Sequence, residues 1–471
     1  MRSQWSTSDG TLLLDLDRTR PVALGVQLEE ELRRAIRDGR LVEGDALPSS
    51  RRLALDLGVS RGLVQASYEQ LSAEGYLSAT IGSGTRVTST LSAGPEPEAP
   101  PTSSARTWID FSPGRPDLHT FPVRDWVWAM SDVTRAAPAR MFGYPDPRGV
   151  DELRDTLAAY LARVRGVTTT AHDIIVCNGF TQGAALALAV LKGLGLRSVA
   201  VEDPGHPDQA SMVERAGLRP VPIAVDEGGM DVAALERSPA EAVLLTPAHQ
   251  TPTGVVLAPT RRQALLKWIT RTGAFVLEDD YDAEFRYDKR PVGSLQPLAP
   301  GNVFSIGSVS KSLGPALRIG WIVAPPHLAS AVAGEKDAAD HGSPALEQLA
   351  LSALMRSGRF DRHLRRMRRL YATRRAVLVD ALALHAPGIT LTGLPAGFHA
   401  VALLSPSADE NEVIERAAAR SVRLHGLARY RSGSSAVTAP GIVFGFGDTH
   451  DDAVRHGIAS IADLLEPPSR P

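Results

Sequence analysis

A lysine surrounded by hydroxyl groups is the strongest chemical feature of this sequence. The run Gly-Ser-Val-Ser-Lys-Ser-Leu-Gly-Pro-Ala-Leu-Arg places Lys311 after Ser308 and Ser310 and upstream of Arg318. A lysine in this setting, after a buried strand, suits Schiff-base formation with a carbonyl group. The two serines and the arginine suit a phosphate, because a guanidinium supplies a planar fork of donors. Taken alone, so short a motif is also typical of an exposed loop lysine.

Acidic residues at the end of an apolar strand supply a second part of the same chemistry. The segment Val-Leu-Glu-Asp-Asp-Tyr contains Asp279, Asp280 and Tyr281. A pyridine cofactor requires a carboxylate that keeps its ring nitrogen protonated. Either Asp279 or Asp280 can fill that position, and Tyr281 can hydrogen-bond the phenolic oxygen of the same ring.

Three further loops follow apolar segments, which is the usual position of site loops in α/β proteins. Phe180 and Thr181 begin an alanine-rich helical stretch, whose backbone amides and N-terminal dipole can bind a phosphate. His206 ends the run Glu-Asp-Pro-Gly-His, and Thr251 lies in His-Gln-Thr-Pro-Thr-Gly. All four residues are therefore candidate cofactor contacts.

Six short apolar segments alternate with helical stretches and must position these loops. They are residues 173–177, 198–202, 242–246, 274–279, 303–307 and 320–324. This alternation indicates an α/β domain with a mostly parallel sheet. From about residue 345 a long helical stretch leads into an α+β tail, which indicates a small C-terminal lobe.

The N-terminal part of the chain carries the pattern of a helix-turn-helix. Residues 24–38 show one apolar helical stripe. Ser49 is a candidate N-cap, Gly58 a candidate helix stop and Ser60 a second N-cap. Two helices joined by so short a turn must cross steeply, as in DNA-binding proteins. The second helix begins with the residues that are free to meet DNA: Ser60, Arg61, Gly62 and Gln65.

Turn and linker patterns divide the chain into domains. Residues 76–87 alternate around Gly-Ser-Gly, which predicts a two-stranded wing. The proline-rich stretch 89–107 cannot bury an apolar face and is predicted to be an extended linker. We therefore expect a multidomain protein with a winged helix-turn-helix at 1–88 and an α/β domain with a small α+β lobe at 108–471.

Composition sets outer bounds on function. The 471 residues are 43% hydrophobic and 22% charged, as in globular proteins of two or three domains. Residues 1–90 hold 11 arginines and 12 acidic residues, so DNA binding rests on a placed motif rather than on bulk charge. The single cysteine, Cys177, excludes a disulfide framework and a thiolate-rich metal site, and no metal is expected. Without an apolar run of membrane length or a secretion signal, we expect a cytoplasmic protein.

Residues 15–88 resemble the winged helix of the GntR family. The family pattern Leu-Pro-Ser-x-Arg-x-Leu-Ala, Gly-Val-Ser-Arg and Gly-x-Gly-Thr-x-Val recurs here almost unbroken. The resemblance implies that Arg61 of the second helix contacts DNA. It also implies DNA contacts outside that helix, from Ser49, Arg51, Ser83, Gly84 and Thr85. The alternative is a three-helix cap that makes only protein contacts and leaves its arginines solvated.

Over residues 15–465 the chain resembles the MocR family, in which a GntR winged helix is fused to a fold-type I aminotransferase-like domain. The resemblance is carried by the loop motifs that hold His206 and Thr251, by Glu-Asp-Asp-Tyr-Asp-Ala-Glu-Phe at 278–285, by the Lys311 segment and by His-Leu-Arg-Arg-Met-Arg at 363–368. It implies pyridoxal 5'-phosphate (PLP) as cofactor and Lys311 as its Schiff-base lysine. It also implies Asp279, rather than Asp280, at the ring nitrogen and Tyr281 at the phenolic oxygen.

The same resemblance implies a phosphate site and a homodimer. The phosphate contacts would come from the backbone of Phe180 and Thr181, from Ser308 and from Arg318. Tyr144 would reach the phosphate of the other subunit, since sites in this family lie at a dimer interface.

Two departures from the family pattern bear on function. The tyrosine that usually stacks on the cofactor ring is replaced by His206, whose imidazole can stack but also carry a proton, unless it simply faces solvent. The late strand at 441–446 lacks the arginine that holds the substrate carboxylate in aminotransferases, although Arg429 and Arg431 lie nearby.

We therefore predict a PLP-dependent transcription regulator that binds operator DNA and responds to a small-molecule effector, either PLP or an amino acid or amine. The missing carboxylate arginine favours PLP as the effector. One alternative is a working PLP-dependent aminotransferase with an accessory N-terminal domain. Another is a scaffold that binds no PLP.

Overall fold

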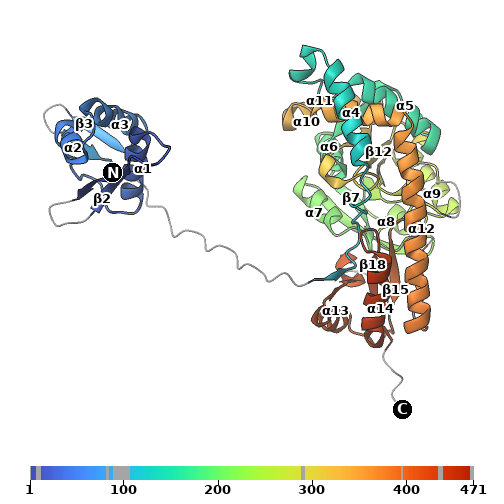
Figure 1. Cartoon of the computed structure of the whole chain (residues 1–471). Coiled ribbons are helices and arrows are strands. Elements are labelled where there is room, and N and C mark those ends of the chain that lie inside the picture. The colour runs from blue at the N-terminus through green and yellow to red at the C-terminus, as the bar shows by residue number, and fades with distance from the viewer. Residues whose placement is uncertain are drawn as a thin grey trace. The chain divides into compact units, whose positions relative to one another are not determined.

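The chain folds into two compact units, residues 1–104 and 105–471. The computed structural model, drawn in Figure 1, describes residues 2–6, 12–80, 84–88, 107–287, 292–393, 396–432 and 439–466. Ser83 and residues 89–106 of the predicted linker lie outside the described residues. Within the described ranges, no helix is long and apolar enough to cross a membrane.

The N-terminal unit is a winged helix-turn-helix, as predicted, with a β-hairpin in front of it. The hairpin pairs β1 with β2 antiparallel, and the sequence patterns do not predict it. Three helices and the antiparallel wing strands β3 and β4 follow. The bounds are β1 Arg2–Ser6, β2 Leu12–Asp17, α1 Leu24–Arg37, α2 Ser50–Leu57, α3 Arg61–Ala73, β3 Leu77–Thr80 and β4 Gly84–Val87.

Local capping fixes the turn between α2 and α3. The Ser49 hydroxyl accepts a hydrogen bond from the backbone N–H of Arg52 at 3.3 Å, and that of Ser60 accepts one from Leu63 at 3.2 Å. Gly58 ends α2 in the left-handed conformation, with φ 61°. Both predicted N-caps and the predicted helix stop are thus present. The helices then bury one shared core, which includes Leu28, Leu32, Leu53, Val64 and Leu71.

A mixed eight-stranded sheet forms the centre of the larger unit. Its strand order is β6-β13-β12-β11-β10-β7-β8-β9. The strands from β12 to β8 in this order run parallel, whereas β13 runs antiparallel to both of its neighbours. The bounds are β6 Ile174–Cys177, β7 Ser198–Asp203, β8 Arg219–Asp226, β9 Gly229–Met230, β10 Ala242–Leu245, β11 Phe275–Asp280, β12 Val303–Ser308 and β13 Gly320–Val323.

The predicted mostly parallel sheet is confirmed, and two of its strands are additions. All six apolar segments form strands whose ends differ from the prediction by at most one residue. The sequence patterns do not predict β8 or β9, because Pro220 and Pro222 interrupt the strand pattern of β8.

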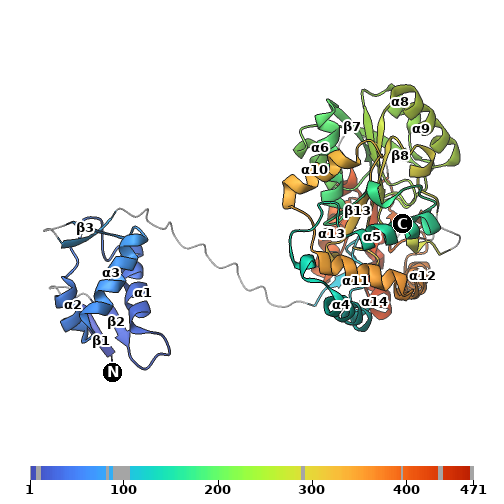
Figure 2. The same ribbon diagram turned by 90° about the horizontal axis from the view of Figure 1, so that it is seen from above.

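Helices cover both faces of this sheet, as Figure 2 shows. Residues of α6 and α10 pack against one face, and residues of α8 and α9 against the other. Helices α5, α11 and α12 build a further core with β6 and β13. The bounds are α5 Asp151–Arg165, α6 Phe180–Gly193, α7 Asp208–Arg215, α8 Val232–Arg237, α9 Pro259–Thr272, α10 Ala329–Asp340, α11 Ala345–Arg356 and α12 Arg359–His385.

A small α+β lobe completes the unit. The long helix α12 leads into a four-stranded sheet of order β14-β15-β18-β17, on which α13 and α14 lie (Figure 1). Residues just after the predicted linker also join this lobe, because β5 pairs in parallel with β16. The bounds are β5 Ile109–Asp110, β14 Leu391–Thr392, β15 His399–Leu403, α13 Glu410–Ala419, β16 Val422–Arg423, β17 His425–Gly426, β18 Gly441–Gly445 and α14 Asp451–Leu465.

Candidate functional site

The predicted site residues lie at one edge of the central sheet. Phe180, His206 and Thr251 follow β6, β7 and β10, while Asp279 and Lys311 lie at or beyond the ends of β11 and β12. The carboxyl ends of parallel strands meet at the same edge, where α/β proteins bind their ligands. The fold therefore brings together side chains that are up to 131 residues apart in the sequence.

Lys311 is partly buried and is held by the backbone. Its Nζ donates a 2.5 Å hydrogen bond to the carbonyl oxygen of Gly114. Burial lowers the pKa of Lys311, although Asp279 and Asp282 oppose this shift. A lowered pKa favours the neutral amine, which is the nucleophilic form. The sequence patterns do not predict the contact with Gly114, because that residue lies almost two hundred positions upstream.

The two neighbouring aspartates of β11 have different surroundings. Asp280 forms a bidentate ion pair with the buried Arg165, whose Nε and Nη2 lie 2.6 and 2.9 Å from its two oxygens. The Oδ1 atom of Asp279 is buried and has no hydrogen-bond partner among the described residues. Burial raises the pKa of Asp279 well above its usual value, and Asp280 and Asp282 raise it further.

Tyr281 lies in a cluster of hydrogen-bonding groups. Its hydroxyl donates to the carbonyl oxygen of His249 at 3.1 Å and also hydrogen-bonds the side chain of Thr251. The Nδ1 atom of His249 lies 2.7 Å from Oδ2 of Asp282, and both of these side chains are buried. Burial raises the pKa of Tyr281 well above its usual value, so the phenol stays protonated. The His249–Asp282 pair is not among the predicted site residues.

The start of α6 meets Arg318, the predicted phosphate-binding arginine. Gly179 precedes the helix with φ 91°, and a Cβ atom built on it would lie 3.3 Å from the Arg318 guanidinium. That guanidinium donates to the carbonyl oxygen of Asn178. The Ser310 backbone N–H donates to the Ser308 hydroxyl at 3.4 Å. The free amides of the first turn of α6, which begins at Phe180, carry a positive partial charge beside this arginine.

His206 and Tyr144 are less enclosed. The Nδ1 atom of His206 accepts a 3.2 Å hydrogen bond from the Asp208 backbone N–H. Desolvation lowers the pKa of His206, and the nearby cations Lys311 and Arg429 lower it further. Tyr144 is 91% exposed, and its ring contacts His341 of the same chain at 6.2 Å between ring centroids.

These groups match the chemical requirements of PLP. An unpaired buried carboxylate suits a protonated pyridine nitrogen, and a lysine with a lowered pKa suits the aldehyde. The helix N-terminus beside Arg318 suits the phosphate. The fit rests above all on Oδ1 of Asp279, which needs a cationic partner or a proton.

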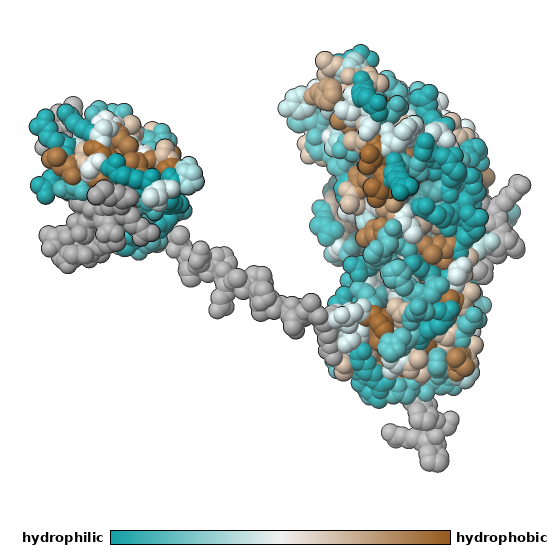
Figure 3. Space-filling view, viewed as in Figure 1, coloured by the Kyte–Doolittle hydropathy of each residue, from teal (hydrophilic) through white to brown (hydrophobic). Residues whose placement is uncertain are grey.

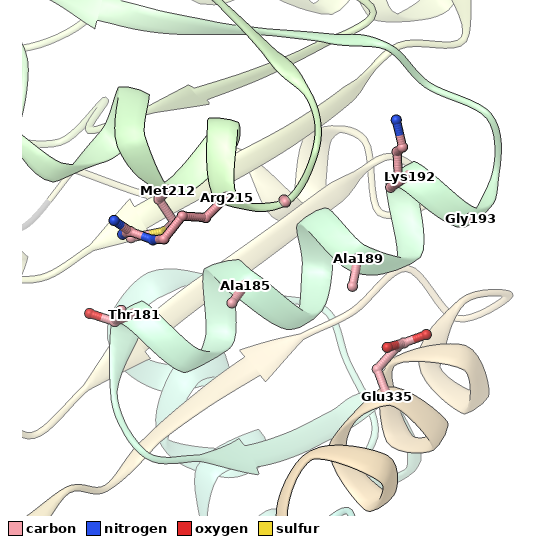
Figure 4. Close-up of a pocket in the computed structure, with 9 residues that line it drawn as sticks. Thr181, Ala185, Ala189, Lys192, Gly193, Met212, Arg215 and Glu335 are labelled. Carbon is pink, nitrogen blue, oxygen red and sulfur yellow. The ribbon is translucent and has the colours of Figure 1, made fainter.

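A groove of about 580 Å³ lies elsewhere, among α6, α7 and α10 (Figure 4). The methyl groups of Ala185 and Ala189 leave it open along α6, and Thr181 lies at its end. Thr181 is the one predicted cofactor contact that lines this groove, and neither Lys311 nor Asp279 does.

The predicted DNA-contacting residues lie on the surface of the N-terminal unit. Arg51, Arg61, Gly62 and Ser60 are exposed, and Gln65 is exposed with its amide donating to Glu69 at 3.1 Å. Within the described residues, neither Arg51 nor Arg61 forms an ion pair. The Ser49 and Ser60 hydroxyls are engaged as helix caps. Gly84 and Thr85 lie in the wing strand β4, whereas Ser83 lies outside the described residues.

Comparisons with known proteins identify both units. Residues 106–427 match the family "Aminotransferase class I and II", and residues 24–87 match "Bacterial regulatory proteins, gntR family". The larger unit is similar to Pyrococcus horikoshii kynurenine aminotransferase, with TM-score 0.70 and 23% identity over 78% of this chain and 93% of that one. It is also similar to the α-aminoadipate aminotransferase LysN of Thermus thermophilus, with TM-score 0.68 and 23% identity over 76% and 92% of the two chains. The fold is therefore that of fold-type I aminotransferases.

Two curated proteins match along nearly their whole length. One is the "HTH-type pyridoxine biosynthesis transcriptional regulator PdxR" of Corynebacterium glutamicum, 33% identical over 96% of this chain and 98% of that protein. The other is the "Probable rhizopine catabolism regulatory protein MocR" of Rhizobium meliloti, 35% identical over 95% of each chain. The chain belongs to the MocR-type family of transcription regulators, in which a GntR winged helix is fused to an aminotransferase-like domain.

The unequal surroundings of Asp279 and Asp280 predict opposite effects of neutral substitutions. In the cofactor-free full chain, Asp279→Asn should raise the free energy of unfolding at neutral pH by about 1 kcal/mol, because it removes a buried carboxyl group that folding disfavours in its ionised form. The pKa of Asp279 is higher in the folded state than in the unfolded state. Wild-type stability should therefore fall as the pH rises above the unfolded-state value, and the variant should lack this fall.

Asp280→Asn is the matched control, because it leaves the buried Arg165 without its ion-pair partner. It should lower the free energy of unfolding by about 3 kcal/mol. Denaturant titrations followed by tryptophan fluorescence at pH 5 and pH 8 measure both effects. Equal destabilisation by the two substitutions would contradict the surroundings assigned to Asp279.

Proposed function

We propose that this chain is a PLP-dependent DNA-binding regulator that responds to a small-molecule effector. The observation that carries this proposal is the presence, in one chain, of an exposed recognition-helix arginine and of a site whose lysine and unpaired carboxylate suit PLP. An effector that binds two states of the protein unequally shifts the balance between them and so changes DNA binding.

The division of labour follows the predicted domains. Residues 1–88 would bind operator DNA, with the start of α3 in the major groove and the wing beside it. Residues 89–107 would link this domain to the cofactor-binding domain at 108–471. Arg51 and Arg61 are suited to DNA because they are exposed and have no ion pair within the described residues.

Each cofactor-binding residue has a defined task. Lys311 would hold PLP through its ε-amino group, Asp279 would pair with the ring nitrogen, and Tyr281 with Thr251 would donate to the phenolic oxygen. Bound PLP supplies an electrophilic carbon and an electron-withdrawing ring. His206 would cover one face of that ring. The phosphate would take its contacts from the following residues: Phe180, Thr181, Ser308, Ser310 and Arg318.

PLP itself, or an amino acid or amine, would be the effector. The late strand β18 carries the buried Val443 and no arginine, so it offers no cation to a substrate carboxylate. This favours PLP sensing, in line with the relative named for pyridoxine biosynthesis. It also disfavours the alternative function, an aminotransferase that turns over amino acids.

A homodimer is supported by an apolar surface around α4 (Val123–Ala136). The side chains of Leu118, Val123, Val127 and Phe142 are each at least half exposed, and Figure 3 shows apolar surface where α4 lies. Exposed apolar side chains gathered in this way mark an interaction site. Tyr144 extends from the same segment and would serve the site of the partner subunit.

Lys311→Ala should abolish the visible absorbance of protein-bound PLP without unfolding the chain, because the ε-amino group is the proposed attachment point. Absorbance spectra after incubation with PLP and dialysis measure retention, and thermal unfolding monitors the fold. Lys267→Ala, at an exposed position of α9, is the control and should keep the cofactor. Retention of the visible band by Lys311→Ala would remove this residue from the proposal.

Arg61→Ala should weaken binding to an operator selected from random duplexes by about 1–3 kcal/mol if the side chain contacts a base edge. If it contacts only phosphate, the loss should be equal on scrambled duplexes and should reduce the salt dependence. Retention assays at two salt concentrations separate these cases. Arg34→Ala, on α1, is the control, and equal affinity of both variants would mean that α3 is not the recognition helix.

The full chain and residues 108–471 alone should both sediment as dimers. Val127→Glu should shift the chain toward monomers and weaken PLP retention, since Tyr144 would serve only the neighbouring site. Leu384→Glu places the same charge at an exposed leucine of α12 and should change neither property. A monomeric fragment 108–471 that retains PLP would refute the dimer and the role of Tyr144 together.

A further inference from the structure

A second cavity, of about 310 Å³, lies beside the loop that carries His206. It is bounded by α7, by the strands β7 and β8, and by residues 429–432 of the small lobe. Val201, Pro220 and Pro222 contribute apolar surface. Neither Lys311 nor Asp279 lines it, so a ligand bound here would not occupy the PLP-attachment site. This volume lies at the lower end of the roughly 300–1,000 Å³ range of small-molecule sites and suits a ligand of few atoms.

Gln209 lines this cavity with a side-chain amide that lacks hydrogen-bond partners among the described residues. It is only 2% exposed, and its Oε1 and Nε2 atoms both lack a hydrogen-bond partner among the described residues. Buried polar groups are nearly always hydrogen-bonded, because an unmet donor or acceptor costs about 1–3 kcal/mol. The amide therefore calls for a ligand that both accepts and donates hydrogen bonds.

Two arginines give the same cavity an anion preference. Arg429 is exposed on the cavity lining. Arg431 donates from Nη2 to the carbonyl oxygen of Ala439 at 2.9 Å, while its buried Nε has no partner among the residues that the structure describes. Guanidinium groups recognise carboxylates with paired, charge-assisted hydrogen bonds.

Two glutamates, Glu202 and Glu214, also line the cavity, but they do not cancel its preference for an anion. Glu202 is buried and accepts hydrogen bonds from the backbone and the hydroxyl of Thr246, at 3.0 and 2.6 Å. Burial raises the pKa of Glu202 to about 7, so it is largely uncharged in mildly acidic solution and partly charged near neutrality. Glu214 is exposed on α7 and its charge is screened by solvent.

Backbone hydrogen bonds join the two sides of the cavity. The Gly205 N–H donates to the carbonyl oxygen of Tyr430 at 2.8 Å, and the Ser432 N–H donates to Oδ1 of Asp203 at 3.1 Å. The first side carries His206, and the second carries both arginines. A ligand that binds Gln209 and Arg429 together would tighten the same junction.

We propose that this cavity is a non-covalent effector site for a small carboxylic acid that also carries a hydroxyl or ammonium donor. The carboxylate binds Arg429 and Arg431, and the donor binds Oε1 of Gln209. Occupancy holds the His206 loop against the small lobe. The influence of the ligand on DNA binding, but not its binding, rests on the function proposed above.

L-Lactate is the probe, because it has the carboxylate and the hydroxyl but no amine that could react with PLP. Calorimetric titration of the PLP-loaded full chain should give one saturable site. Lactamide, which lacks the charge, and propionate, which lacks the donor, should bind at least about tenfold more weakly. L-Lactate should also shift the visible absorbance of bound PLP through the His206 loop.

Gln209→Leu and Arg429→Ala should each weaken L-lactate binding by about tenfold or more while keeping PLP retention and DNA binding. Leucine fills the space of the glutamine without an unmet polar group, and Arg429 is exposed, so both variants should fold, as thermal unfolding will show. Arg455→Ala, on the surface of α14, is the control and should bind L-lactate like the wild type.

Two outcomes would overturn the site. They are the absence of saturable L-lactate binding to the wild type, which would mean that the cavity holds only water, and equal binding by the wild type and Gln209→Leu. Absence of PLP absorbance or of DNA binding in the wild type would instead refute the function proposed above. L-Lactate binding to the cavity, measured by calorimetry, does not depend on either of those two properties.

Discussion

Three consecutive carboxyl groups at the end of β11, of which one is buried and two are half-buried, each require a partner, and the partners they find set the character of the site. Alternation along a strand directs Glu278 and Asp280 to one face and Asp279 to the other. The first face provides partners, since the backbone N–H of Leu295 donates to Glu278 and Arg165 pairs with Asp280. The second face provides none for Oδ1 of Asp279 within the described residues, and Lys311 lies on that side. The carboxyl group left without a partner in this way suits a protonated pyridine nitrogen.

The neighbouring strand places Lys311 relative to this charge. β12 runs parallel to β11, with Asp279 opposite Ile306 and Asp280 opposite Gly307. Gly307 has to be a glycine, because a Cβ atom there would lie 2.7 Å from the indole of Trp321. The strand therefore stays close to β13, and the loop after it returns the Lys311 amine toward the sheet edge and Gly114. Backbone packing and the hydrogen bond from Nζ to the Gly114 carbonyl oxygen together fix where the amine lies.

Local sequence patterns predict much of this architecture, because the features concerned depend on neighbours in the chain. Ser49, Gly58 and Ser60 mark the helix-turn-helix through caps formed within four residues. The prolines of β8 disfavour a strand prediction from composition alone. The strand nevertheless forms, because it pairs with β7 in the sheet. The pairing of β1 with β2 is not predicted although the sequence between them contains Asp-Gly, a dipeptide typical of hairpin turns, because β1 holds a single large apolar residue, Trp5, and so shows no strand alternation.

Contacts between site residues that lie far apart in the sequence cannot be predicted from local patterns. The residue types alone leave Asp279 and Asp280 equivalent, and the family resemblance favours Asp279. The physical difference between them comes from Arg165, more than a hundred residues upstream, which pairs with Asp280. The contact of Lys311 with Gly114 and the orphan amide of Gln209 depend on the packing of whole elements against one another. Motifs thus reveal which residue types meet, whereas their individual surroundings follow from the tertiary fold.

The pairing of β5 with β16 has a mechanical consequence. Ile109 and Asp110 follow the predicted linker almost directly, yet they are hydrogen-bonded into the small lobe and not into the central sheet. The point where the predicted linker joins the larger unit is therefore part of the small lobe. If the small lobe rotated against the central sheet, the C-terminal end of the predicted linker would rotate with it. A force applied through the predicted linker would in turn act on the small lobe through the same two residues.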